Sequence, residues 1–160
     1  MTAIDREHLV DLLSATHSKT RAILKGIDLD IQVYDDGGWR IRDILGHIAT
    51  WDRQVSLSLR AFSSGTEYAI PEFDEEAFNI EDVRRQVSLT SQQVFEEWEM
   101  ARELFKDAVR EIPQDRFPGD LLYPWGDERG TVVKLVKEMC DHDEEHYSEI
   151  SRAIEASLET

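Results

Sequence analysis

The sequence predicts an all-α protein that folds as a four-helix bundle, and three observations support this fold class. Four segments of about 22–26 residues carry apolar side chains at steps of three and four, which is the spacing of an amphipathic helix. No segment shows a convincing strand pattern. The chain has 160 residues, enough to bury a core, so we expect one domain over residues 1–160.

The first two helices are predicted over residues 5–26 and 40–62. Gly26 is suited to end the first, because glycine readily adopts the left-handed conformation that often follows a helix. The apolar stripe of the first helix comprises Leu9, Leu12, Leu13, Thr16, Thr20, Ile23 and Ile27. The stripe of the second comprises Ile41, Ile44, Ile48, Trp51, Val55, Leu59 and Phe62.

The third and fourth helices are predicted over residues 91–112 and 131–156. Thr90 and Gln93 have the spacing of a capping box at the start of the third, and Pro113 stops it. The inward residues of the third helix are Val94, Trp98, Ala101, Phe105, Ala108 and Ile112. Those of the fourth are Val132, Leu135, Met139, His142, His146, Ile150 and Ala153.

Two connections are long for a bundle. Residues 63–90 link the second and third helices, and we expect them to hold a short helix near 81–87. A link of this length can cross the bundle, so these helices need not be antiparallel neighbours. Residues 113–130 precede the fourth helix and are too apolar for disorder, so we expect this loop to cover one end of the bundle. Its large apolar side chains are Phe117, Leu121, Leu122, Tyr123 and Trp125.

The charge of the chain limits its partners. It has 34 acidic and 18 basic residues and a net charge of −16. Such a surface repels nucleic acid and anionic membranes, so we expect neither as a partner. No apolar run reaches the length of a membrane span, and the charged N-terminus lacks the apolar region of a signal peptide. The single cysteine, Cys140, excludes an internal disulfide, and a cytoplasmic location is expected.

Histidines interrupt the apolar stripes. His142 and His146 are one turn apart on the fourth helix, the spacing at which one helix presents two nitrogen ligands to a metal ion. His47 borders the stripe of the second helix, so the three could meet in the core and leave coordination positions open. The alternative is that each is a core-edge or solvent-edge histidine that only forms hydrogen bonds. His8 and His17 have no partner at ligand spacing, and we interpret them as structural or surface residues.

Two motifs stand out in the sequence. The first, in residues 38–54, comprises Gly38, Trp39, Asp43, His47, Trp51 and Asp52, and the second, in residues 124–150, comprises Trp125, Gly126, His142 and His146. Both resemble signatures of the DinB/YfiT-like superfamily. Residues 70–79 are similar to the ClbS/DfsB branch of that superfamily. The resemblance implies a four-helix bundle with a long crossover and a homodimer. It also implies that His47, His142 and His146 bind zinc, nickel or another divalent ion. Arg40 stands where the family often has a capping Ser or Thr, which leaves the start of the second helix in question.

The resemblance and the chemistry of the histidines together predict a divalent-metal-dependent enzyme. We expect the metal to activate water or a low-molecular-weight thiol against an electrophilic small molecule, in hydrolysis or thiol transfer. Trp51, Tyr123 and Trp125 are candidates to line the pocket, and Asp43 is a candidate to orient His47.

Two other readings stay open. The protein could bind and sequester a small molecule without turnover, or it could be a family member without metal whose histidines form a polar cluster. Cys140 is about 200° around the helix from His142, so its thiol should point away from the histidines. The acidic residues between His142 and His146 are expected at the solvated surface.

Overall fold

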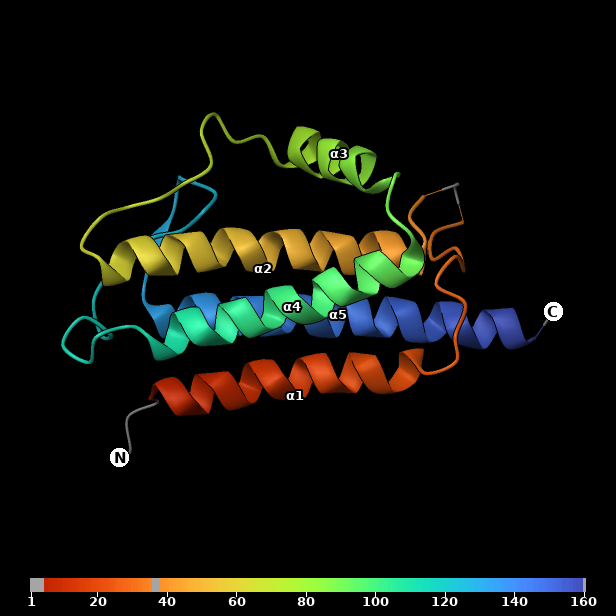
Figure 1. Cartoon of the computed structure of the whole chain (residues 1–160), viewed down its shortest axis with the longest axis horizontal. Coiled ribbons are helices and arrows are strands. Elements are labelled where there is room, and N and C mark those ends of the chain that lie inside the picture. Colours follow the sequence, from red (N-terminus) through yellow and green to blue (C-terminus); the bar gives the residue numbers. More distant parts are fainter. Residues whose placement is uncertain (1–4, 36–37, 160) are drawn as a thin grey trace.

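The computed structural model describes residues 5–35 and 38–159. Four long helices form a bundle, which confirms the predicted all-α fold class (Figure 1). They are α1 (Arg6–Leu24), α2 (Ile41–Ser63), α4 (Ser91–Arg110) and α5 (Val132–Leu158). None of the helices in the described ranges is long and apolar enough to cross a bilayer. The signal-peptide prediction rests partly on residues 1–4, which lie outside the described residues.

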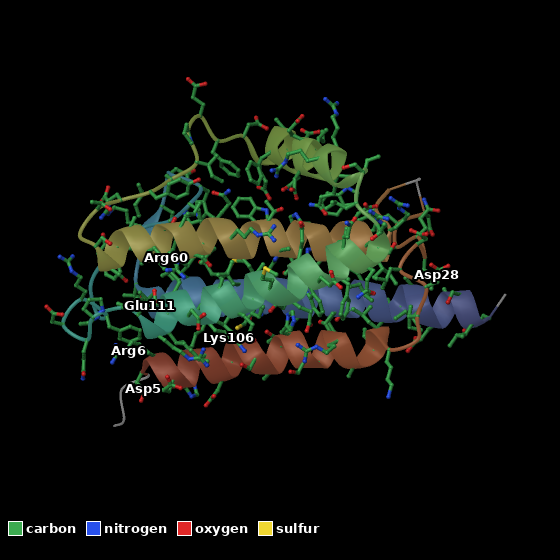
Figure 2. All side chains as sticks on the ribbon, in the orientation of Figure 1. Asp5, Arg6, Asp28, Arg60, Lys106 and Glu111 are labelled. Carbon is green, nitrogen blue, oxygen red and sulfur yellow. The ribbon has the colours of Figure 1, made fainter. Side chains whose placement is uncertain are left out.

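The helices run in two parallel pairs, because the link between α2 and α4 crosses the length of the bundle (Figure 1). At one end Arg42 Nη1 lies 3.2 Å from Ser91 Oγ. At the other end Arg60 Nη1 lies 3.0 Å from Glu111 Oε2 (Figure 2). α1 and α5 run in the opposite direction. The predicted crossover is therefore confirmed, and it makes α2 and α4 parallel neighbours.

The crossover carries the helix α3 (Glu75–Gln86), which begins earlier than the predicted segment at 81–87. The reason is the cap at Asp74, whose side chain accepts a hydrogen bond from the Ala77 backbone N–H at 2.9 Å. Glu75 and Glu76 then occupy the first turn, where negative charge suits the helix dipole. These signals permit a helix although its residues are mostly exposed.

Residues 113–130 pack against the core as predicted, but they also form a hairpin that the sequence analysis did not predict. β1 (Leu121–Leu122) pairs antiparallel with β2 (Arg129–Gly130). Strands of two residues are too short to show an alternating pattern, and for this reason the hairpin could not be predicted from the sequence. Leu121 and Tyr123 lie in the core, and Gly126 adopts a φ of 87° in the connecting turn.

Asp43 resolves the question raised by Arg40 at the start of α2. The Asp43 carboxylate accepts a hydrogen bond from the Arg40 backbone N–H at 2.9 Å and another from Arg40 Nε at 3.2 Å. The cap is therefore supplied from within the first turn. At α4 the predicted capping box of Thr90 and Gln93 is present with both hydrogen bonds.

A buried polar network, the Arg102 network, lies between two apolar clusters of the core. Arg102 of α4 is 1% exposed and pairs with Asp52 of α2 and Asp143 of α5, at shortest distances of 2.9 and 2.7 Å. Thr16 of α1 donates to Asp143 at 2.6 Å. All four bundle helices therefore meet in this network. The expectation that the acidic residues after His142 are solvated is wrong for Asp143, because successive helix positions point about 100° apart and Asp143 faces the interior.

Candidate metal centre

Three histidine side chains from two antiparallel helices converge at one point. His47 Nε2 of α2 lies 3.1 Å from His142 Nε2 of α5, and His146 Nε2 lies 3.0 Å from the same atom. One nitrogen from each residue lies within 4.8 Å of the other two. The spacing of His142 and His146 places both on one face of α5, and the antiparallel packing of α2 brings His47 opposite them.

The three imidazoles are neutral at neutral pH. Burial and then the nearby histidines lower the pKa of His47 to about 3, and burial followed by His146 lowers that of His142 to about 4. The pKa of His146 is also lowered, chiefly by burial. Neutral imidazoles keep the lone pairs that a metal ion requires.

The separations fit a shared ion. Two nitrogens about 2.1 Å from one zinc ion, at angles between 90° and tetrahedral, lie roughly 3.0–3.4 Å apart. The two short Nε2–Nε2 separations fall in this range.

The hydrogen bonding of the cluster also favours an ion. His142 Nε2 approaches both other Nε2 atoms, yet one ring nitrogen carries either one proton or one lone pair and cannot serve both neighbours well. The Nδ1 atoms of all three rings are buried without a hydrogen-bond partner. Buried polar atoms are normally paired, so a cluster of neutral rings alone is a costly arrangement.

Glu149 is an acidic residue beside the cluster that was not predicted from the sequence. Its Oε1 lies 3.6 Å from His146 Nδ1, and the Tyr34 hydroxyl donates to its Oε2. The i, i+3 spacing of His146 and Glu149 could have predicted that Glu149 lies near the cluster. No feature of the sequence predicted the contact with Tyr34. Asp43 was expected to orient His47, but its carboxylate instead accepts a hydrogen bond from Arg40. The Nδ1 atom of His47 has no hydrogen-bond partner.

A pocket of about 380 Å³ opens beside the histidines. Its lining residues are His47, Trp51, Phe73, Glu75, Trp125, Asp127, Glu138, Met139 and His142. Trp51 and Trp125, two of the predicted pocket residues, are among them. Tyr123 does not line the pocket, because it is fully buried and its hydroxyl donates to the Thr131 carbonyl at 2.8 Å. It supports the wall indirectly through an edge contact with Trp125, with ring centroids 5.4 Å apart.

The remaining histidines and the cysteine lie outside the cluster. His17 is buried, stacks on Trp98 at 3.8 Å and pairs with Glu99 at 2.8 Å, so it is a core residue. His8 is exposed. Cys140 is half-buried, and burial and then Asp143 raise its thiol pKa to about 11, so it is a poor nucleophile.

Sequence comparison identifies the family. The model of the DinB superfamily matches residues 12–150, which is most of the chain. The chain belongs to the DinB superfamily. No curated protein matches it in sequence.

Solved structures of this fold are similar over nearly the whole chain. YfiT from Bacillus subtilis, described as a probable metal-dependent hydrolase with an unusual four-helix bundle topology, has a TM-score of 0.72 and 16% identity. That match covers 96% of this chain and 89% of YfiT.

The mycothiol-dependent maleylpyruvate isomerase has a TM-score of 0.74 and 16% identity, and a mutant of it has a TM-score of 0.75 and 15% identity. Each match covers 94% of this chain but 63% of the isomerase. Identities this low establish the shared fold, and chemistry has to be argued from the site.

Proposed function

We propose that this DinB-superfamily protein is a divalent-metal-dependent enzyme acting on an electrophilic small molecule, by hydrolysis or thiol transfer. The observation that carries the proposal is the convergence of three neutral histidine nitrogens beside a pocket. Three protein ligands leave coordination positions open, as in catalytic metal sites. A divalent ion supplies such a site with charge that lowers the pKa of water or a thiol and polarises an electrophile.

The chain's own residues would divide the remaining work. His47, His142 and His146 would hold the ion through Nε2, and Glu149 would orient His146 from its other nitrogen. Trp51, Phe73 and Trp125 would enclose the apolar part of the substrate and exclude water from that side. The pocket is large enough for a small molecule and has histidines in its wall, so a reactive centre would lie next to the ion.

The ion is proposed to be zinc or nickel, because imidazole ligands suit both. YfiT supports the hydrolytic alternative, since it is described as a probable metal-dependent hydrolase. The isomerase supports a low-molecular-weight thiol as co-substrate, since it is described as mycothiol-dependent. Membership of the ClbS/DfsB branch and homodimer formation stay predictions that follow from the resemblance.

Metal analysis of untagged, purified protein tests the proposal. We expect about one equivalent of a divalent ion per chain and its loss in His142→Ala. His8→Ala is the matched control, because His8 is exposed and lies outside the cluster. A full metal equivalent retained by His142→Ala would show that the site assignment is wrong.

The aromatic walls of the pocket also favour a second function, in which the protein binds and sequesters a small molecule without turnover. Steady turnover of an electrophile, with or without added thiol, would exclude it. Wild-type protein that lacks stoichiometric metal would instead support the third alternative, a family member whose histidines form only a polar cluster.

A further inference from the structure

The pocket beside the histidines has a charge that the proposed function does not explain. Three of its lining side chains are carboxylates, Glu75, Asp127 and Glu138, and none of its described lining residues is Lys or Arg. We infer that the pocket takes a small molecule that carries a positive charge, as an amine or quaternary ammonium group, next to an apolar body. This inference deepens the proposed function by naming the substrate class of the same site.

The negative charge of the pocket is only partly neutralised by its surroundings. Lys134 lies near one of these carboxylates, and its Nζ is 2.7 Å from Glu128 Oε2 but 3.8 Å from Glu138 Oε1. The Lys134 ammonium group is therefore closer to Glu128 than to Glu138. Glu138 is half-buried, and burial and then the Glu128 charge raise the pKa of its carboxyl, so an added cation would stabilise its charged form.

The three carboxylates together outweigh the two positive charges of a bound divalent ion. An anionic substrate would have to approach this surface against repulsion, whereas a cation would be attracted into the pocket.

The aromatic walls suit the same ligand. The ring centroids of Trp51 and Phe73 lie 5.6 Å apart, and those of Trp51 and Trp125 lie 6.2 Å apart. Hydrogen bonds from the indole N–H groups hold both tryptophans, with Trp51 donating to Asn79 at 3.2 Å and Trp125 to Glu128 at 2.9 Å. Aromatic side chains grouped around a cavity are a known means of binding ammonium groups, and nearby carboxylates strengthen it.

Binding of two probe molecules to metal-free full-length protein tests the inference. The probes are benzyltrimethylammonium and phenylacetate, with benzyl alcohol as the neutral reference, measured by calorimetry at low ionic strength. We expect the cation to bind at least about tenfold more tightly than the anion, and added salt to reduce the difference. Quenching of tryptophan fluorescence that is lost in Trp125→Phe would place the cation in this pocket.

The role of Glu138 is tested with a matched control. Glu138→Gln should weaken binding of the cation by about threefold to fivefold. Glu155→Gln changes the net charge equally on the same helix, but Glu155 is exposed and outside the pocket, so it should leave binding unchanged.

Three results would each overturn the inference: phenylacetate binding as tightly as the cation, no binding of the cation at millimolar concentration, or equal effects of the two Glu→Gln variants. Neither metal content nor turnover enters this experiment. A failure would therefore refute the charge preference, while the metal site depends on its own test.

Discussion

The Arg102 network and the histidine cluster are two polar groups of side chains inside one apolar bundle, and they differ in how completely their hydrogen bonds are satisfied. The five N–H donors of Arg102 all have acceptors, which are Asp52, Asp143 and the Leu13 carbonyl. The three buried Nδ1 atoms of the histidines have no hydrogen-bond partner, although Glu149 Oε1 lies 3.6 Å from that of His146, and their Nε2 atoms face one another. A network whose hydrogen bonds are all satisfied stabilises the fold. A convergent cluster whose nitrogens lack hydrogen bonds is instead suited to bind a metal ion.

The largest expected effect separates these roles. Arg102→Met would leave the buried carboxylates of Asp52 and Asp143 unpaired, which should lower the free energy of unfolding by about 3–5 kcal/mol. Burial opposes the charge on Arg102, but Asp52 and Asp143 outweigh it and raise the guanidinium pKa. Burial also raises the pKa of Asp52, to about 6, so the loss has to be measured at neutral pH or above, where both partners are charged. Urea unfolding of metal-free protein measures the loss, with exposed Arg152→Met as control. A loss below 1 kcal/mol would remove the distinction between the two groups.

The second effect concerns the histidines. His142→Ala should cost little stability in metal-free protein, because it removes an unsatisfied group. In wild type, a metal ion at a hundred times its Kd should add about 2.7 kcal/mol to the free energy of unfolding, and His142→Ala should abolish this gain. Thermal unfolding with and without added zinc gives both numbers. A variant as unstable as Arg102→Met would indicate that the histidines are structural.

The third effect is a pH dependence from His17, which lies beside the Arg102 network. Burial and then the Arg102 charge lower the pKa of His17 to about 4. In the unfolded chain this pKa is near 6.5, so the unfolded state binds the proton first, and stability falls as the pH drops from about 6.5 toward 4. His17→Gln should reduce that fall by on the order of 2 kcal/mol. Unfolding of metal-free protein at pH 7 and pH 4 checks it, and identical pH profiles would contradict the prediction.

The smallest effect tests whether the histidine cluster has supporting groups of its own. Glu149→Gln removes the carboxylate charge beside His146 and should weaken metal affinity about tenfold. Tyr34→Phe should act in the same direction more weakly, because Tyr34 reaches the cluster only through Glu149. Competition with a zinc chelator measures the affinities, and Glu155→Gln serves as control. Unchanged affinity in Glu149→Gln would show that the carboxylate does not orient His146.

Local patterns in the sequence were sufficient for the helices and for part of the site. Apolar spacing located the four bundle helices, and the capping box of Thr90 and Gln93 marked the start of α4. The pair His142 and His146 was identifiable because residues four apart share a helix face. These features depend on residues close together in the chain, and helix geometry relates such residues directly.

Only the tertiary structure decided which distant residues meet. It brought His47 to the α5 pair, turned Asp143 inward to Arg102, and placed Glu149 between His146 and Tyr34. It also buried Tyr123 beneath the pocket wall. The physical reason is that periodicity defines the faces of each helix but not its rotation, direction or register against a neighbour. Packing of all four helices sets these, and here it separates a satisfied ion-pair network from a histidine cluster whose buried Nδ1 atoms have no hydrogen-bond partner.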